Sequence, residues 1–280
     1  MRRTETCGSG RVAHRCGGWS EMSGWISGLG AFLGRSAETT GYGLVLLGRT
    51  LFHLPHLLTR RRIRDTLDLC YTYCTGSFTV TAVVALFTGM ILALNSGLSL
   101  QELGQEALIG RIVAVSLIRE MGPFMTALIL TASIGSGIAA ELGTMKVSEE
   151  IDALRIMSIS PVRFLILPRI VALTLVTPVL TIFAGLIGIL GGMFVAYFQL
   201  GVGWMAFQND GLEVLTQKDV FTGLFKSVVF GVTIATVGCT QGLLTRGGAT
   251  GVGQAARRAV VVTFLLVIIM GYYITWAVLT

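Results

Sequence analysis

Two ionisable residues interrupt an otherwise apolar stretch of this chain. Arg119 and Glu120 are the only charged residues in a run that extends from Ile112 to Ala140. A charge at membrane depth is costly, so such side chains usually pair with other groups or line a water-filled or ligand-holding cavity. The Gly122-Pro123 pair that follows can loosen a helix. We therefore expect Arg119 and Glu120 to border a cavity, with a position at the lipid headgroups as the alternative.

A second group of charges lies in the segment 139–169, between two long apolar runs. Three acids stand where the positive end of a helix dipole favours them: Glu149, Glu150 and Asp152. An apolar stripe at helical spacing accompanies them: Ile151, Leu154 and Met157. Ser148 is a candidate N-cap, Arg155 lies near the other end, and Pro161 is expected to end the helix. The pattern predicts a short amphipathic helix over 148–160 on the water side of a membrane, with an ordinary surface helix as the alternative.

No pattern typical of catalysis occurs in the chain. The sequence GxxxxGK[ST] is absent, which argues against nucleotide hydrolysis through a P-loop. The glycines of Gly248–Gly253 stand in the wrong order for a dinucleotide-binding fingerprint and favour a flexible turn. Nothing resembles a nucleophile, base and acid in combination. We expect no catalytic residue in this chain.

The cysteines and histidines do not predict a metal site. The five cysteines form no CxxC pair: Cys7, Cys16, Cys70, Cys74 and Cys239. Cys70 and Cys74 lie one helical turn apart and are interpreted as small apolar core residues. His53 and His56 share a helical face, but no third ligand is nearby, so interfacial histidines are favoured over a metal site.

The composition indicates an integral membrane protein. Hydrophobic residues make up 53% of the chain and charged residues 13%, whereas soluble domains carry about 25% charged residues. The 36 glycines suit close packing of helices in lipid. The net charge of +6 is attributed to loops beside anionic lipid, because no aromatic and basic nucleic-acid-binding module is visible.

Hydropathy predicts an all-α integral membrane protein with five transmembrane helices, an N-terminal interfacial amphipathic helix and a cytoplasmic coupling helix. The five apolar segments are long enough to cross a bilayer: about 69–101, 112–140, 165–200, 224–245 and 259–280. Residues 1–28 are expected to form a disordered leader. Residues 29–64 are too often interrupted by charges to span, which favours a helix at the membrane surface.

The distribution of basic residues predicts the orientation. Arg60–Arg64, the stretch from Lys146 to Arg169 and the stretch from Arg246 to Arg258 fall on one side, whereas only Arg111, Lys218 and Lys226 fall on the other. The positive-inside rule places the N-terminus in the cytoplasm and the C-terminus on the opposite side.

A ridge of small residues runs along the third apolar segment and contains one GxxxG motif: Gly185, Gly188 and Gly192. It predicts a helix-packing surface, either within one chain or between two copies.

Three blocks of sequence carry a family resemblance. SLIREMGPFMTALILTASIGSGIAAELGTMKVSEEIDALRIMSISPVRFLILPR, KSVVFGVTIATVGCTQG and TGVGQAARRAVV occur in this order. They resemble the MlaE/YrbE permeases, which are membrane subunits of ABC transporters that work with MCE proteins. The likeness covers the chain from about Leu44 to the C-terminus.

The resemblance implies a homodimeric permease domain over 29–280 in a bacterial inner membrane. It also implies three kinds of protein partner: a cytoplasmic ABC ATPase that holds the ATP and Mg, a periplasmic MCE-domain protein, and often a STAS-domain protein. The implied cargo is lipid, usually phospholipid, moved between the inner membrane and the outer envelope in connection with outer membrane asymmetry. No cofactor is expected in this chain.

The resemblance also implies two sets of site residues. Coupling to the ATPase would involve the segment Glu149–Met157, namely Glu149, Glu150, Asp152, Ala153, Leu154, Arg155 and Met157. The lipid pocket would involve Leu92, Leu100, Leu103, Arg119, Glu120 and Met121. Ser133 departs from the family, which often has arginine there, so a role tied to that charge is in doubt.

Two other functions remain open at this point. An ion-coupled secondary transporter could use Arg119 and Glu120, although the odd number of spans and the absence of an evident internal repeat argue against it. A non-transporting anchor for an envelope complex would need only the glycine-bearing spans.

Overall fold

The computed structural model describes residues 41, 43, 45–48, 50, 60–105 and 108–279. The chain divides into two units, Met1–Tyr42 and Gly43–Thr280, and the description below concerns the second. The predicted leader and most of the predicted interfacial helix lie outside the described residues.

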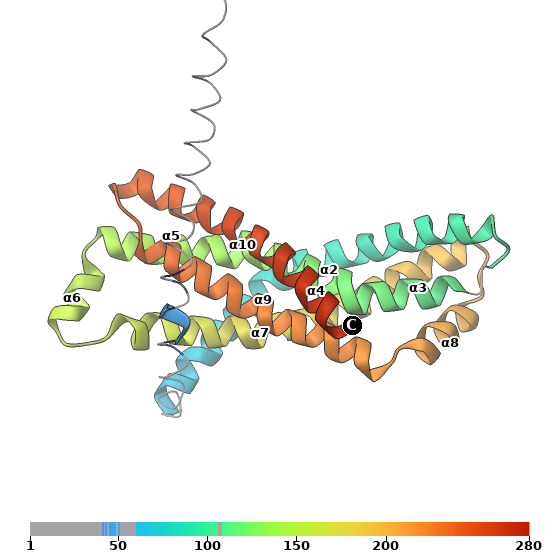
Figure 1. The fold of residues 1–280 in the computed structure, drawn as a ribbon, viewed down its shortest axis with the longest axis horizontal. Coiled ribbons are helices and arrows are strands. Elements are labelled where there is room, and N and C mark those ends of the chain that lie inside the picture. Colours follow the sequence, from blue (N-terminus) through green and yellow to red (C-terminus); the bar gives the residue numbers. More distant parts are fainter. Residues whose placement is uncertain are drawn as a thin grey trace, which may run out of the picture. The chain divides into compact units, whose positions relative to one another are not determined.

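The described part of the second unit contains helices and no strand, which confirms the all-α class. The elements from residue 60 onward are shown in Figure 1: α2 (Arg60–Gln101), α3 (Ile109–Ser116), η3 (Leu117–Met121), α4 (Gly122–Leu130), η4 (Thr131–Gly135), α5 (Ser136–Val147), α6 (Glu150–Ile156), η5 (Val162–Ile166), α7 (Leu167–Gln199), α8 (Trp204–Val214), α9 (Gln217–Leu243) and α10 (Gly248–Leu279). The η elements are short π-helical segments, which commonly occur as bulges inside α-helices.

Five of the described helical stretches are long and apolar enough to cross a membrane, as predicted: Ile63–Gln101, Ile109–Val147, Val162–Gln199, Gln217–Leu243 and Gly248–Val278. The second is a composite of α3, η3, α4, η4 and α5. Every stretch begins before its predicted segment, because helical hydrogen bonding continues into the flanking polar residues. The last three stretches end one or two residues before their predicted segments do.

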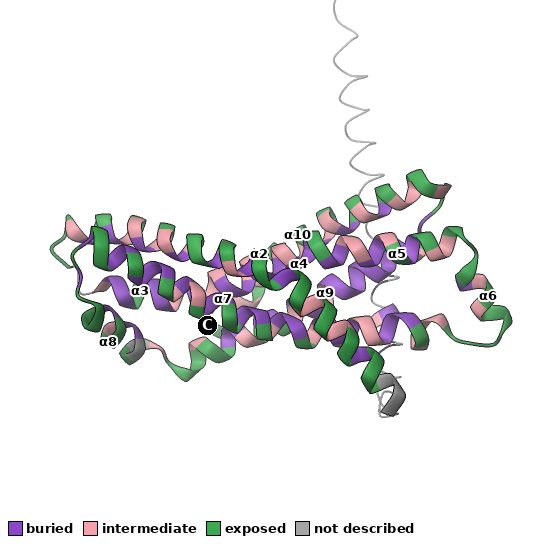
Figure 2. Ribbon diagram, turned by 180° about the vertical axis from the view of Figure 1, so that it is seen from behind, coloured by how far each residue is buried: buried purple, intermediate pink, exposed green. Residues whose placement is uncertain are grey.

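The interior holds two apolar clusters at different levels of the bundle. The first lies among α4, α5, α7 and α9 and includes Leu142, Leu173 and Phe230. The second lies between α2, α3, α7 and α8 and includes Val113 and Phe207. Figure 2 shows buried residues along one face of these helices and exposed residues along the other, which is the pattern of helices that pack inward and face lipid outward.

The glycine ridge packs within one chain, against α2. A Cβ atom at Gly188 would lie 3.2 Å from the carbonyl oxygen of Ala85, and one at Gly192 would lie 3.3 Å from the carbonyl oxygen of Gly89, whereas Gly185 faces Ile118 of η3. Any larger residue would push the two backbones apart. The sequence pattern therefore identified a real packing surface, and the structure assigns it to the contact between α2 and α7.

Candidate functional site

The short helix α6 joins α5 to η5 at one end of the bundle (Figure 1). It spans Glu150–Ile156, less than the predicted segment. The prediction that Ser148 caps it is wrong, because the Ser148 N–H donates to the Thr144 carbonyl and so completes α5. Glu149 then turns the chain with a left-handed φ of 60° and stands at the N-cap of α6.

The other end of α6 is also set by a left-handed residue. Ser158 has a φ of 60°. Its N–H donates to the Arg155 carbonyl, and the Ile159 N–H donates to the Leu154 carbonyl, both at 3.0 Å. This is a Schellman motif, which ends a helix by satisfying its last carbonyls. The helix thus ends before Pro161, which instead precedes η5, so the expectation that Pro161 ends the helix is wrong.

One ion pair between α5 and α6 and one buried residue of α6 hold this helix in place. Asp152 accepts hydrogen bonds from Lys146 at 2.7 Å and from Arg155 at 3.2 Å. The hydrogen bond from Lys146 holds the pKa of the Asp152 carboxyl below its usual range. Ile151 is fully buried in the first apolar cluster. A seven-residue helix is too short to be stable alone. These contacts therefore hold α6 in a defined position.

The predicted apolar stripe of α6 is confirmed for Ile151 and Leu154 but not for Met157. Leu154 packs against the first cluster, whereas Met157 is exposed beside Ile156, which is 85% exposed. The remaining predicted coupling residues present polar groups or a methyl group to water: Glu149, Glu150, Ala153 and Arg155, with Asp152 partly exposed. The corner therefore presents acidic, basic and apolar groups together on one exposed surface.

Close to α6, an ion pair joins α5, which precedes it, to α7, which follows it after η5. Arg169 of α7 donates to Glu141 of α5 at 3.0 Å. The arginine side chain is only 11% exposed, whereas the glutamate is 64% exposed. The pair ties the two arms of the α6 corner to each other.

A second group of charges lies far along the bundle, where η3, α9 and α10 meet. Lys226 of α9 donates to both carboxylate oxygens of Glu120 at 2.7 Å. Its ammonium also lies 2.6 Å from the Thr275 hydroxyl of α10, which is 3.1 Å from Glu120. The Lys226 side chain is 1% exposed and that of Glu120 is 40% exposed. A buried cation is thus held by a carboxylate that solvent can reach.

The sequence around Pro123 explains why this cation fits here. Proline has no N–H, so the carbonyl of Arg119, four residues earlier, loses its helical donor. The Lys226 ammonium lies 3.5 Å from that carbonyl oxygen. The π-helical segment η3 carries Arg119 and Glu120 immediately before this point. Lys226 therefore supplies a positive charge to both the carboxylate of Glu120 and the carbonyl of Arg119.

Arg119 has its own partner on α9. Its guanidinium lies 3.5 Å from Asp219, and both side chains are mostly buried. Asp219 also accepts a hydrogen bond from the Thr216 N–H in a capping box at the start of α9. Arg119 and Glu120 do not pair with each other, and each joins η3 to the first half of α9.

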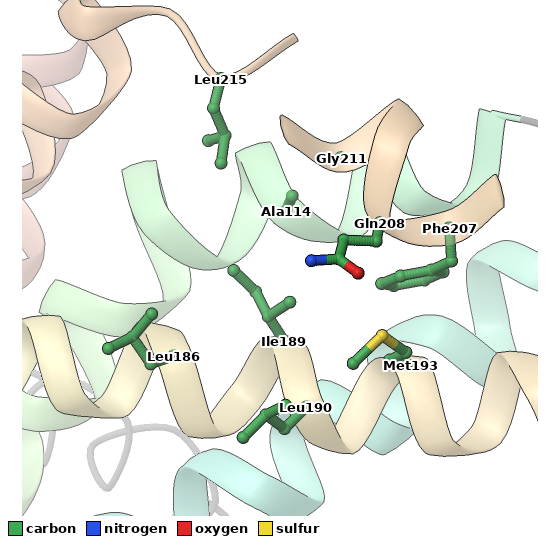
Figure 3. A pocket seen from close by; sticks show the side chains of 9 residues that line it. All are labelled: Ala114, Leu186, Ile189, Leu190, Met193, Phe207, Gln208, Gly211 and Leu215. Carbon is green, nitrogen blue, oxygen red and sulfur yellow. The ribbon is translucent and has the colours of Figure 1, made fainter. Parts of the chain in front are cut away.

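A cavity of about 340 Å³ lies between α3, α7 and α8 (Figure 3). Its lining is apolar except for one amide: Ala114, Leu186, Ile189, Leu190, Met193, Phe207, Gln208, Gly211 and Leu215. In Figure 3 the side chains of Ile189, Met193 and Phe207 converge on the same space from α7 and α8.

The sequence model of the family Permease MlaE matches residues 66–277. This range includes all five spans except the first three residues of the first span and the last residue of the fifth. The chain belongs to the MlaE permease family. It is 35% identical over 231 residues to a protein of Synechocystis sp. named "Probable ABC transporter permease protein", covering 82% of this chain and 87% of that one. A protein of the same description from Rickettsia typhi is 37% identical over 199 residues, or 71% and 77% of the two chains.

A plant relative extends the similarity. The chloroplastic protein TRIGALACTOSYLDIACYLGLYCEROL 1 of Arabidopsis thaliana is 31% identical over 212 residues, covering 76% of this chain and 61% of that protein. The MlaE family membership makes this chain the permease component of an ABC transporter, rather than an ion-coupled secondary transporter or a passive anchor.

In this MlaE-family permease the six residues predicted to bind lipid occupy different surroundings. Leu92, Leu100 and Met121 pack in or against the second apolar cluster, and Leu103 is exposed in the turn after α2. Arg119 and Glu120 bind to α9, as described above. The cavity of Figure 3 is lined by other residues.

Sequence reasoning missed the role of Lys226, which it counted only among the few basic residues on the side opposite the cytoplasm. The structure places it inside α9, nine residues after the helix begins. A signal was present, because Val220, Phe221, Leu224 and Phe225 precede it and continue the apolar character of the helix. The Ser133 hydroxyl lies 3.3 Å from the Ser77 hydroxyl of α2.

Proposed function

We propose that this permease moves lipids, in the first place phospholipids, between a bacterial inner membrane and the outer envelope. The energy comes from ATP and Mg bound in a separate cytoplasmic ABC ATPase. An MCE-domain protein on the periplasmic side receives or delivers the lipid, two copies of the permease form the transport unit, and a STAS-domain protein attaches to the ATPase. The N-terminus and α6 face the cytoplasm and the C-terminus faces the periplasm.

The construction of α6 is the observation that carries this proposal. The helix is held to the bundle by Ile151 and Asp152, while Ile156 and Met157 project into water. An exposed pair of large apolar side chains on a short charged helix is a poor surface for water and a good one for a partner protein. The family assignment supplies the class of partner, an ATPase subunit.

The helices on either side of α6 provide a route for the motion. A push on α6 reaches α5 and α7 together because Glu141 and Arg169 join them. The second span then carries the displacement from α5 to η3, whose charges bind α9 and α10. Lipid is moved if the two conformations of the spans bind it with different affinities, because only a differential affinity lets the ATPase cycle do work on it.

Two observations support lipid as the cargo. The spans expose long apolar faces to the bilayer, and the second apolar cluster is built beside a cavity with an almost wholly apolar lining. The Arabidopsis relative also carries the name of a galactolipid, trigalactosyldiacylglycerol.

The test is a charge reversal on α6 in the reconstituted complex of permease, ATPase and MCE protein. Asp152→Lys would place a third cation beside Lys146 and Arg155 and displace the helix surface without removing a buried group. We expect ATP hydrolysis to continue while lipid movement between liposome populations is lost. Glu102→Lys, the same change at an exposed position after α2, is the matched control and should transport normally. Lipid movement at the normal rate by the Asp152→Lys complex would refute the proposal.

A further inference from the structure

The ion pair between Glu141 and Arg169 marks one boundary of the hydrocarbon layer on the bundle. Beyond it, α7 continues without a charged residue to its end. A hydrocarbon layer about 30 Å thick corresponds to roughly 20 helical residues at 1.5 Å each. Counting that distance from Arg169 along α7 leads to Ile189, and counting it backwards from Glu141 leads to Met121. The far boundary therefore passes near Ile189 and the Glu120–Lys226 pair.

The last turns of α10 give an independent estimate of the same boundary. Thr275 contacts both Lys226 and Glu120. Tyr272, Tyr273 and Trp276 are exposed around it. Tyr and Trp gather where hydrocarbon meets the headgroups. Gly122 faces Thr181, and Gly188 faces Leu117, so Met121 and Ile189 stand at different levels of the bundle. The two counts place the boundary in the band between these levels, and the aromatic group lies at the Glu120 side of that band.

The cavity of Figure 3 begins within this band at Leu186 and extends beyond it to Met193. Leu186 and Leu190, both half-exposed, stand at its mouth on the lipid-facing side of α7. Met193 and Phe207 are buried at its inner end, on the far side of Ile189 from the hydrocarbon layer. The mouth thus opens at the edge of the hydrocarbon, and the cavity leads from there towards α8.

We propose that this cavity binds one acyl chain of a lipid from the leaflet at the α8 end of the protein. The cavity is continuous with the membrane-facing surface of α7, which belongs to one of the five spans, so lipid chains already lie against the mouth. The lining has one polar side chain, Gln208, and no charged one. Nothing in it selects a headgroup, and everything in it suits a hydrocarbon chain.

The size of the cavity favours a single chain over larger occupants. Its volume of about 340 Å³ is at the low end for small-ligand sites. A helix of a partner protein is about 10 Å wide with its side chains and would not enter such a space. The headgroup and second chain of the lipid would remain outside the mouth, in the membrane.

This inference deepens the proposed lipid transport by giving the permease a lateral lipid site, and as a step in transport it rests on that proposal. Binding of the chain itself can be tested without the ATPase or the MCE protein. Binding of an acyl chain in the cavity and the proposed lipid transport can therefore be refuted separately.

The experiment uses the full chain in nanodiscs that contain phosphatidylethanolamine with a diazirine at the end of one acyl chain. Illumination should attach the lipid to peptides that contain residues 186–193 and 207–215, read by mass spectrometry. A phosphatidylglycerol probe with the same chain should give the same sites and yield, because the lining carries no charge.

Leu190→Trp should narrow the mouth and remove most of the attachment at these sites, while labelling elsewhere on the spans stays unchanged. Leu175→Trp is the matched control, since Leu175 is exposed to the same extent on α7 but lies outside the lining. Ala114→Phe fills the cavity from α3 and serves as a second variant, with a thermal melt to verify folding.

Three results would overturn the proposal. One is attachment around the cavity no stronger than around Leu175. Another is unchanged attachment in both folded cavity variants. The third, in the assembled complex, is loss of lipid attachment together with cross-links from the cavity residues to a partner protein, which would make the cavity part of a protein interface. Lipid movement by the same variants, measured in parallel, then shows whether the proposed transport continues when this site is lost.

Discussion

The same pair of groups, a lysine ammonium and a carboxylate 2.7 Å apart, occurs in two very different settings in this permease. At α6, Lys146 and Asp152 are both partly exposed, with side-chain exposures of 29% and 44%. At η3, Lys226 is almost completely buried, and only its partner Glu120 reaches solvent. The first pair orients a surface helix. The second neutralises a cation that the fold has placed inside the bundle.

The difference predicts opposite responses to mutation. Exposed ion pairs contribute little to stability, because water solvates either partner well when the other is removed. A buried charge that loses its partner is left without compensation. We therefore expect the pair at α6 to matter for coupling to the ATPase and the pair at η3 to matter for folding. The mutations below test that division, from the largest expected effect to the smallest.

Removing the carboxylate of the buried pair should have the largest effect. Glu120→Leu leaves the Lys226 ammonium with only the Thr275 hydroxyl and the Arg119 carbonyl as partners. Breaking a buried pair in this way costs about 3–5 kcal/mol. A marked drop in Tm in detergent, with less lipid retained on purification, is the expected outcome. A Tm equal to that of the parent chain would show that the pair does not stabilise the bundle.

Removing the cation should cost less. Lys226→Met replaces the buried group with an apolar one of similar length, and the 40% exposed Glu120 side chain can be solvated. We expect a loss of about 1–3 kcal/mol, because one hydrogen-bonded charge loses its partner without being buried. The double variant Glu120→Leu with Lys226→Met should be more stable than Glu120→Leu alone, since no unpaired charge remains. Additive losses in the double variant would contradict a direct interaction between the two side chains.

The smallest effect on stability is expected at α6, and it should depend on pH. The pKa of Asp152 is lowered in the folded protein by its hydrogen bond from Lys146, so the pair stabilises α6 above the ordinary carboxyl pKa of 3.8. That contribution disappears as the pH falls through the lowered pKa of the folded state. Hydrogen exchange of α6 should therefore be slower in the parent chain than in Asp152→Asn at pH 6, and the difference should vanish in strong acid. A difference that grows on acidification would contradict the assignment.

Much of the fold could be predicted from the sequence because a bilayer requires long apolar helices, which hydropathy detects. Five apolar segments of sufficient length give five spans, and the charged segment between two of them gives α6. The ends of α6 could not be predicted in the same way. Glu149 and Ser158 adopt left-handed conformations that favour glycine, and their residue types give no sign of it.

The buried sites depend on contacts that local sequence does not encode. Lys226 belongs inside the bundle because Glu120 is 106 residues earlier and Thr275 is 49 residues later. The cavity exists because α8 packs its Phe207 against α3 beside α7. Hydropathy identified Arg119 and Glu120 as unusual, but it could not show that each would bind a different residue of α9.

The position of α6 relative to the ATPase is the most direct test of the account. An Ile156→Cys variant, in a chain whose five native cysteines are replaced by alanine, can be combined in cells with the ATPase subunit and a short bifunctional thiol cross-linker. We expect a covalent adduct with the ATPase and no reaction with a membrane-impermeant maleimide added outside the cells, whereas Leu103→Cys at the opposite end should show the reverse. Labelling of the Ile156→Cys variant from outside, or the absence of any adduct with the ATPase, would contradict the account.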